Sequence, residues 1–327
     1  MRAVRLSEPG GPLKVEKVPV PSPGKGELLI KMQFSPVNPS DLALIRRGYL
    51  DRTYPFTPGL EGSGRVIASG GGVMGRVRLG KEVACSPGTK NDGTWAEYMV
   101  TTAFNVAPLP SGISPEQGSM MLVNPMTAMA FLQMAREGHH RAVINTAAAS
   151  SLGRMLIRLC NHYGLPLINI VRRPGQVEEL KQVGATHILD SESDSFPDDL
   201  ASVARDLRAT LLLDAIAGEQ SARLLAAAPE GAVMVNYARL SEDPVTAEPS
   251  DLMMKGKQVR GFQLGAWLSG KSLLFKLRFI RKVKKHMKRE LQSEIRQVFP
   301  MEQVNEAIDR YTRQMTGGKV ILQLYEE

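Results

Sequence analysis

The chain has 327 residues, of which 43% are hydrophobic and 23% charged, and its formal net charge at pH 7 is +8. This length exceeds the roughly 250–300 residues at which a single core stops growing, so two domains are expected. The composition is that of a folded globular chain and excludes general disorder. The basic excess suits anionic ligands such as phosphates, acidic proteins or nucleic acid, and it does not choose among them.

The sequence shows no recognisable membrane or export segment. There is no run of about 18 apolar residues, and the first residues lack the apolar core of a signal peptide. Cys85 and Cys160 are too few for a disulfide framework or a four-cysteine zinc lobe. We therefore expect a cytoplasmic protein with no membrane partner.

The first part of the chain, up to about residue 113, is predicted to form an irregular, mostly β domain. Gly and Pro are frequent there, and turn signals separate short runs of β-type residues. The expected strands are Glu27–Met32, Gly64–Ala68, Glu82–Ala84 and Ala96–Val100.

From about residue 115, short apolar runs alternate with amphipathic segments of helical length. This alternation implies βαβ units, whose right-handed crossovers produce a parallel sheet with helices on both faces. We therefore expect an α/β domain with a doubly wound sheet. The expected strands are Ala142–Thr146, Pro166–Val171, His187–Leu189, Thr210–Ala215 and Gly231–Tyr237, and the helices between them are Ser151–Tyr163, Gln176–Val183, Pro197–Leu207 and Glu219–Ala227.

The first expected strand of this domain ends in a candidate nucleotide-binding turn. Ala147, Ser150 and Gly153 occupy the three positions of a GxxGxxG-like pattern. A dinucleotide requires small residues here, because the backbone must approach the pyrophosphate at a helix N-terminus. Only the last of the three is glycine, so ordinary packing at a helix start remains an alternative.

The second expected strand ends in Arg172 and Arg173 rather than in a carboxylate. Asp or Glu at this place would bind the 2′-hydroxyl of NAD, whereas Arg accommodates the 2′-phosphate of NADP. Because a guanidinium matches phosphate geometry, the sequence favours NADPH as the cofactor. The alternative is that the two arginines are solvated and bind no phosphate.

Several short motifs follow one another along nearly the whole chain: Pro21–Glu27, Asn38–Asp41, Arg47–Tyr49, Pro58–Gly64, Gly93–Tyr98, Asn124–Thr127, the nucleotide turn, Gly261–Leu264 and Gly318–Val320. In this order they resemble the zinc-independent medium-chain dehydrogenase/reductases, in particular the trans-2-enoyl thioester reductases and more loosely the NADPH:quinone oxidoreductases. The resemblance implies a GroES-like catalytic domain made of residues 1–114 and 265–327, with a Rossmann NADPH-binding domain of residues 115–264 between them. It also implies a homodimer.

The resemblance further implies that no metal is bound. Asn38 and Leu60 stand where the zinc-dependent relatives carry a Cys and a His, and only Glu61 is retained. Neither Asn nor Leu provides a thiolate or an imidazole. The adjacent His139 and His140 are expected in a solvated loop rather than as ligands.

Without a metal, hydride delivery from NADPH suits an activated alkene, such as a 2-enoyl thioester of coenzyme A or acyl carrier protein, or alternatively a quinone. Negative charge then develops as an enolate, which a hydrogen-bond donor stabilises. Tyr49 stands where the enoyl thioester reductases carry their catalytic tyrosine, and Tyr54 in the same loop is the alternative donor.

The resemblance places further residues around these groups. It assigns Asn38, Thr127, Tyr237, Phe262 and Lys319 to the cofactor, and Tyr54 and Trp267 to the substrate pocket. Gln263 stands where the enoyl reductases tend to have a second tryptophan, which leaves the acyl chain length open. An alternative of another class is a catalytically silent member that binds NADPH or nucleic acid.

The segment Lys271–Arg289 is strongly basic, and its apolar residues recur at helical spacing. A solvated helix surface explains it most simply; phosphates of coenzyme A, an acidic acyl carrier protein or nucleic acid are alternatives. Nucleic acid is not expected, because the spacing of Phe275, Phe279 and Val283 suits packing better than base stacking.

Overall fold

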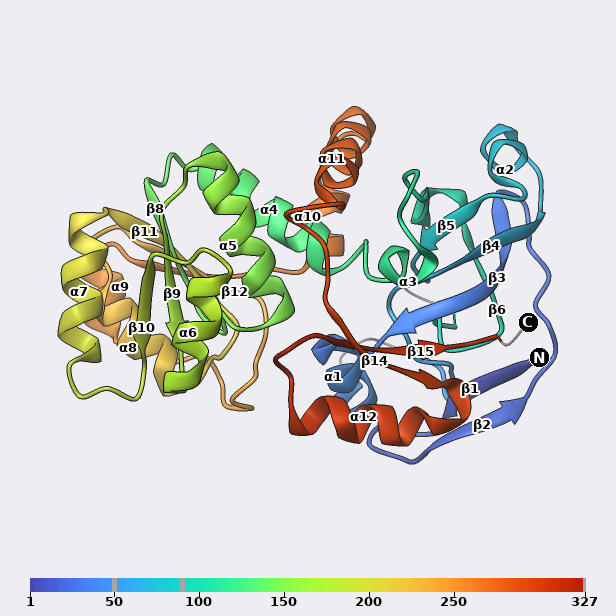
Figure 1. Cartoon of the computed structure of the whole chain (residues 1–327), viewed down its shortest axis with the longest axis horizontal. Helices are drawn as coiled ribbons and strands as arrows, with labels where there is room; N and C mark the ends of the chain where they lie inside the picture. The colour runs from blue at the N-terminus through green and yellow to red at the C-terminus, as the bar shows by residue number, and fades with distance from the viewer. Residues whose placement is uncertain (49–51, 89–91, 326–327) are drawn as a thin grey trace. The chain divides into compact units, whose positions relative to one another are not determined.

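The computed structural model describes residues 1–48, 52–88 and 92–325 of the chain, which form two compact units (Figure 1). Unit 1 consists of residues 1–124 and 292–327, and unit 2 of residues 125–291. The expected combination of a β-rich part with a parallel α/β part is confirmed. The unit boundaries differ from the predicted 114/115 and 264/265, since residues 115–124 belong to the β-rich unit and residues 265–291 to the α/β unit.

Unit 1 is built on a seven-stranded sheet of order β14-β15-β3-β4-β5-β7, with β6 also paired to β3. The central strand β3 (Glu27–Pro36) is largely apolar and mostly buried, as expected of a strand with neighbours on both sides. The other strands are β4 (Gly62–Ser69), β5 (Glu82–Cys85), β6 (Tyr98–Thr102), β7 (Val106–Pro108), β14 (Ile295–Pro300) and β15 (Lys319–Gln323), beside a β1 (Arg2–Leu6) and β2 (Leu13–Lys17) hairpin. The helices are α1 (Pro39–Arg47), α2 (Val73–Arg78), α3 (Pro115–Gly118) and α12 (Val304–Arg313), with short 3-10 turns at Ala103–Asn105 and Met301–Gln303.

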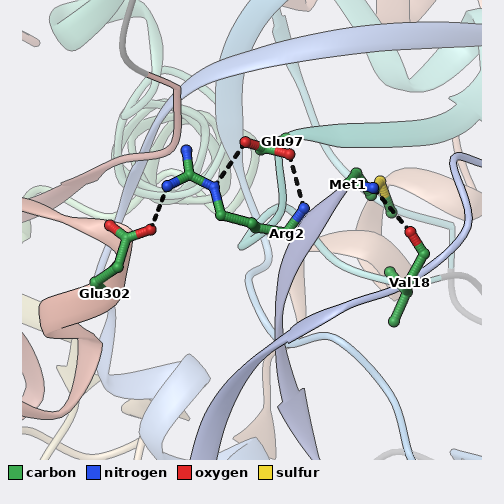
Figure 2. A network of polar contacts seen from close by, with 5 residues as sticks. All are labelled: Met1, Arg2, Val18, Glu97 and Glu302. Carbon is green, nitrogen blue, oxygen red and sulfur yellow. Dashed lines mark hydrogen bonds and ion pairs between the residues drawn. The ribbon is translucent and has the colours of Figure 1, made fainter.

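An ionic network around Arg2 joins the two chain ends within unit 1 (Figure 2). The Glu97 carboxylate accepts the backbone N–H of Arg2 at 2.7 Å and its Nε–H at 2.8 Å. Arg2 also pairs with Glu302 of the C-terminal segment at 2.6 Å, while the amino group of Met1 donates to the Val18 carbonyl at 2.8 Å. Although burial opposes the effect, the bonds from Arg2 hold the pKa of Glu97 below its ordinary value.

Unit 2 contains a six-stranded, all-parallel sheet of order β10-β9-β8-β11-β12-β13. Its strands are β8 (Ala142–Asn145), β9 (Leu167–Val171), β10 (His187–Asp190), β11 (Ala209–Asp214), β12 (Val233–Asn236) and β13 (Gln258–Gly261). The strand order changes direction between β8 and β11, and in such sheets ligands bind at the carboxyl ends of the strands at this switch point. The nucleotide turn predicted after β8 lies there.

The helices of unit 2 are α4 (Asn124–Glu137), α5 (Ser151–Tyr163), α6 (Pro174–Gln182), α7 (Phe196–Asp206), α8 (Glu219–Ala227), α9 (Pro249–Met253), α10 (Leu264–Ser269) and α11 (Leu273–His286). The last two belong to this unit because Trp267 packs on Phe262 and His286 bonds Tyr163 of α5. In the described part of the chain, no helix combines the length and apolar content needed to cross a membrane.

The Arg2 network predicts an acid-sensitive contribution to stability. Glu97→Gln should lower the free energy of unfolding by about 1 kcal/mol at neutral pH, because it removes a charged acceptor that is 14% exposed from a pair whose arginine is 40% exposed. A carboxylate whose pKa is lowered on folding stabilises the protein above its unfolded pKa of 4.5 and loses that contribution as the pH falls through the folded value. The difference between variant and wild type should therefore shrink below pH 4.5 in urea unfolding series.

The control for this experiment is Glu302→Gln, which removes the more exposed partner of the same arginine. Its effect should be about 0.5 kcal/mol or less. Equal losses for the two variants, independent of pH, would contradict the interpretation.

Candidate functional site

The turn between β8 and α5 is shaped for close approach of a ligand to the backbone. Ala147 has a φ of +49°, and the Ser150 hydroxyl caps α5 by accepting the N–H of Gly153 at 3.1 Å. A Cβ on Gly153 would lie 2.2 Å from the carbonyl oxygen of Ala148, so only glycine fits. The three predicted turn residues therefore lie together at the N-terminus of a long helix, where free N–H groups and the helix dipole favour an anion.

Asn145, the last residue of β8, was not singled out from the sequence. Its side chain is fully buried, yet neither its amide oxygen nor its amide nitrogen has a hydrogen-bond partner among the residues that the structure describes. Buried amides without partners are rare and call for an explanation. A polar ligand at the adjoining turn provides one, so the local residues fit a dinucleotide.

Asp214, the last residue of β11, organises the same edge of the sheet and was also missed by the sequence analysis. Its buried carboxylate accepts hydrogen bonds from Thr146, Ile216, Ala217, Ser221 and Asn236, at 2.7–3.2 Å. Because these groups come from the residue after β8, from β12 and from the segment between β11 and the first turn of α8, Asp214 fixes the strand ends around the switch point. The sequence did contain a signal that could have identified Asp214, namely a carboxylate at the end of an otherwise apolar strand.

Arg172 and Arg173 follow directly after β9 and are exposed. Within residues 1–48, 52–88 and 92–325, neither guanidinium has an ion-pair partner, and the nearby Glu179 pairs with Arg154 at 2.6 Å. The two guanidinium groups are thus available to an external anion at the end of the second strand.

An aromatic cluster in unit 2 brings together three of the predicted residues. The Phe131 ring lies 5.0 Å from the Tyr237 ring and 4.8 Å from the Phe262 ring, and Phe262 lies 6.3 Å from Trp267. Thr127, which is nearly buried, precedes Phe131 by one turn of α4. Burial and the carboxylate of Asp214 raise the pKa of Tyr237, which keeps its phenol protonated.

A second group of predicted residues forms a buried polar cluster in unit 1. Asn38 donates from Nδ2 to Glu61 Oε1 at 3.1 Å and accepts a hydrogen bond from the ammonium of Lys319. The other oxygen of Glu61 accepts the N–H groups of Leu122 and Val123 at 2.9 and 2.8 Å. The structure therefore brings Asn38 and Lys319 together, and each is at most 2% exposed.

Burial dominates the electrostatics of this cluster. It raises the pKa of Glu61, against the ammonium of Lys319 and the hydrogen bonds, and it lowers the pKa of Lys319, against Glu61 and Asp41. Asp41, which accepts the N–H of Asn38 at 2.8 Å, has its pKa raised to about 7 by burial and by Glu61. The hydrogen bond to Asn38 and the attraction of Glu61 and Asp41 are the interactions that oppose burial and favour the charged form of Lys319.

The residues of this cluster do not fit a catalytic zinc ion. Leu60 offers no donor atom, and both oxygens of Glu61 and the Asn38 amide oxygen already accept hydrogen bonds. Burial and the nearby Glu61 raise the pKa of the Cys85 thiol, so no thiolate is available, and Lys319 would repel a cation.

The histidines lie elsewhere. His140 bonds Thr210 at 2.8 Å, which makes it a half-buried structural residue rather than part of a solvated loop. Among the described residues, His162, His286 and Glu290 lie close enough together to hold a metal, in unit 2 on α5 and at the end of α11.

The candidate catalytic residue Tyr49 lies outside the described residues. Tyr54 is partly buried, with its ring against Phe56 at 5.2 Å, and its hydroxyl is buried without a partner among the residues described. This hydroxyl lies 3.1 Å from the place that a Cβ on Gly48, with a φ of +58°, would occupy. Tyr54 therefore has an unused donor close to the residue that precedes Tyr49.

Comparisons with known proteins agree with this architecture. The family model described as the alcohol dehydrogenase GroES-like domain matches residues 24–111, and the one described as zinc-binding dehydrogenase matches residues 151–277. The mitochondrial enoyl-[acyl-carrier-protein] reductase of Bos taurus is 31% identical over 277 residues, which is 82% of this chain and 73% of the relative. That of Caenorhabditis elegans is 30% identical over 270 residues, 79% of this chain and 76% of the relative.

Solved structures of the same architecture align with 99% of this chain. A protein from Mesorhizobium loti assigned as an NADPH:quinone reductase is 29% identical with a TM-score of 0.88, covering 99% of this chain and 98% of that one. The quinone oxidoreductase of Thermus thermophilus, also solved with NADPH, is 25% identical with a TM-score of 0.78, covering 99% and 100%. With the switch-point turn and the β-rich unit in place, these similarities show that the chain is an oxidoreductase of the medium-chain dehydrogenase/reductase family, in its group of enoyl and quinone reductases.

Proposed function

We propose that the chain is an NADPH-dependent reductase of 2-enoyl thioesters that works without zinc. The observation that carries the proposal is the buried cluster of Asn38, Glu61 and Lys319, which replaces a metal centre with an internal ammonium. Without a Lewis acid to polarise an isolated carbonyl, the acceptor must already be activated, as an alkene conjugated to a thioester is. The enoyl reductases of Bos taurus and Caenorhabditis elegans support this substrate class.

The residues of unit 2 are assigned to the dinucleotide as follows. Ala147, Ser150 and Gly153 receive the pyrophosphate, and Arg172 and Arg173 receive the 2′-phosphate. Thr127 is assigned to the nicotinamide, and Tyr237 and Phe262 to the cofactor. In unit 1, Asn38 and Lys319 are assigned to the cofactor by the family resemblance, although the bond between them also gives them a structural role. When bound, NADPH supplies a hydride.

The protein's own part in the chemistry is to manage charge and a proton. Hydride addition at the β-carbon of the enoyl group leaves negative charge on the thioester oxygen, and a proton must then reach the α-carbon. The phenol of Tyr49, or of Tyr54, is protonated at neutral pH and donates a hydrogen bond to that oxygen. Trp267 contributes an apolar wall for the acyl chain.

A quinone is the second candidate acceptor, and the fold similarity to the Mesorhizobium loti and Thermus thermophilus proteins favours it. A catalytically silent member that binds NADPH or nucleic acid is the alternative of another class. The turn at Gly153 and the unpartnered Asn145 argue for a functioning cofactor site.

A homodimer is also part of the proposal, and the edge of the unit 2 sheet supports it. β13 (Gln258–Gly261) is the terminal strand, all four of its residues are exposed, and an unpaired edge invites another strand. A second copy pairing there would cover it. The cytoplasmic setting stays a prediction that rests on the cysteine content, while the relatives' names place them in mitochondria.

The cofactor assignment predicts that NADPH binds better than NADH by roughly ten- to a few-hundredfold, about 1.4–3 kcal/mol. Arg172→Ala with Arg173→Ala should remove most of this preference by weakening NADPH binding alone, as measured by fluorescence titration. Arg205→Ala with Arg208→Ala, at the end of α7, removes the same charge elsewhere and should leave the preference intact. Equal affinity of the wild type for both cofactors would refute the assignment.

Metal independence predicts that prolonged treatment with a chelator leaves both fold and activity unchanged. The metal content of the purified protein, measured by atomic emission, should be far below one ion per chain. Stoichiometric zinc that is lost together with activity would overturn this part of the proposal.

The tyrosine mechanism predicts that Tyr49→Phe lowers kcat for crotonyl thioesters by ~10²–10³, or ~2.7–4 kcal/mol, the usual effect of losing one such donor. KM and the NADPH Kd should change little, since the bond strengthens mainly in the transition state. Quinone reduction should suffer less, because water can protonate the reduced oxygens.

Tyr54→Phe is the matched control and removes a hydroxyl that has no partner among the described residues, so the fold should tolerate it. Full activity of Tyr49→Phe with loss of activity in Tyr54→Phe would make Tyr54 the donor. If neither variant changes the rate, the tyrosine mechanism is wrong.

A further inference from the structure

Helix α11 presents a cationic face that the proposed chemistry does not use. Its exposed side chains and those just after it are strongly basic: Arg278, Arg281, Lys282, Lys285, Lys288 and Arg289. In the part of the chain that the structure describes, none of these six has an ion-pair partner. With 14 residues the helix is about 21 Å long, so the charge extends along a line rather than around a point.

The N-terminal half of the same helix exposes apolar side chains. Leu273, Leu274 and Leu277 are 59%, 57% and 54% exposed. Apolar residues that adjoin unpaired cations are typical of a surface that a protein partner covers, because apolar contact provides affinity and charge provides steering and orientation.

Both ends of α11 are anchored, so this face is preformed. At its start, the rings of Phe275 and Phe279 lie 5.7 and 5.3 Å from Trp267. At its end, His286 bonds the Tyr163 hydroxyl at 2.8 Å and the Glu290 carboxylate at 2.8 Å. A rigid surface loses little entropy on binding a partner.

We propose that the exposed face of α11 docks an acidic acyl carrier protein that delivers the enoyl thioester. The inference rests on the proposed function, and it adds the surface on which the carrier docks. Opposite charge is the complement that six unpaired cations require. The contact of Trp267 with Phe275 and Phe279 also places the docking helix directly against the residue assigned to the acyl pocket.

Two other polyanions fit the face less well. The phosphates of coenzyme A would engage only a few cations and would leave the three leucines uncovered. Single-stranded nucleic acid binds through exposed aromatic rings, whereas Phe279 is buried and Phe275 stacks on it at 5.7 Å.

The first test measures the binding of a purified holo acyl carrier protein by calorimetry. Arg281→Glu with Lys285→Glu should raise Kd roughly tenfold or more, and wild-type binding should weaken as salt is raised. Leu277→Ser should weaken binding without this salt dependence. The control, Arg205→Glu with Arg208→Glu, makes the same charge change in the last turn of α7 and just after it, also in unit 2, and should alter Kd less than about twofold. Carrier protein that does not bind, or binds the α11 variant as well as the wild type, would overturn the proposal.

The second test separates docking from catalysis by presenting the crotonyl group on the carrier protein, on coenzyme A and on pantetheine. The α11 variant should lose roughly tenfold in kcat/KM on the carrier protein and nothing on pantetheine. An equal loss on coenzyme A would assign the face to nucleotide phosphates and overturn the docking proposal. The docking proposal would also be overturned if a labelled single-stranded RNA bound to the α11 face with a lower Kd than the carrier protein. Carrier binding that depends on α11, without reduction of any crotonyl thioester, would refute the proposed function and leave docking standing.

Discussion

The ammonium group of Lys319 lies fully inside unit 1, and the arrangement of that unit follows from the groups that compensate its charge. A buried charge without partners is very costly, so Asn38, Glu61 and Asp41 have to converge on it. These partners come from the N-terminal part of the chain, whereas Lys319 begins β15 in the C-terminal part. The same interaction therefore joins two distant segments and occupies the atoms that a metal would need.

In unit 2 the equivalent constraint is the reversal of strand order between β8 and β11. It leaves the carboxyl ends of neighbouring strands facing a common ligand position. Asp214 holds those ends with hydrogen bonds, and Gly153 allows α5 to start close to the backbone of Ala148. The turn can thus lack two of the usual glycines and still bring the backbone near a pyrophosphate.

The two charged features of the chain have different physical characters. In the cluster around Lys319, burial and pairing leave no capacity for an external ion. On α11, the exposed cations have no partner among the described residues and surround apolar side chains, so their charge is directed outward. Six of the exposed basic residues thus gather on and just after one helix, α11, beside the aromatic cluster that contains Trp267.

Local patterns were sufficient to predict much of this molecule. The alternation of apolar runs and amphipathic segments predicted the parallel strands of unit 2 nearly at their observed bounds, because each element has a periodicity of its own. Ala147, Ser150, Gly153, Arg172 and Arg173 could be placed for the same reason, since a strand end and a helix start are local features. The short strands β1, β2, β7 and β14 were not predicted.

Only the tertiary structure decided what depends on distant partners. The bond between Lys319 and Asn38 joins residues 281 positions apart, and no local pattern reports such a pairing. Phe131 became visible as the link between Tyr237 and Phe262 only through packing, as did Asn145 through its unpartnered amide. The sequence by itself determined the family, the fold class and the candidate cofactor turn; the burial and pairing of charges required the folded chain, because desolvation acts on a side chain only once other segments surround it.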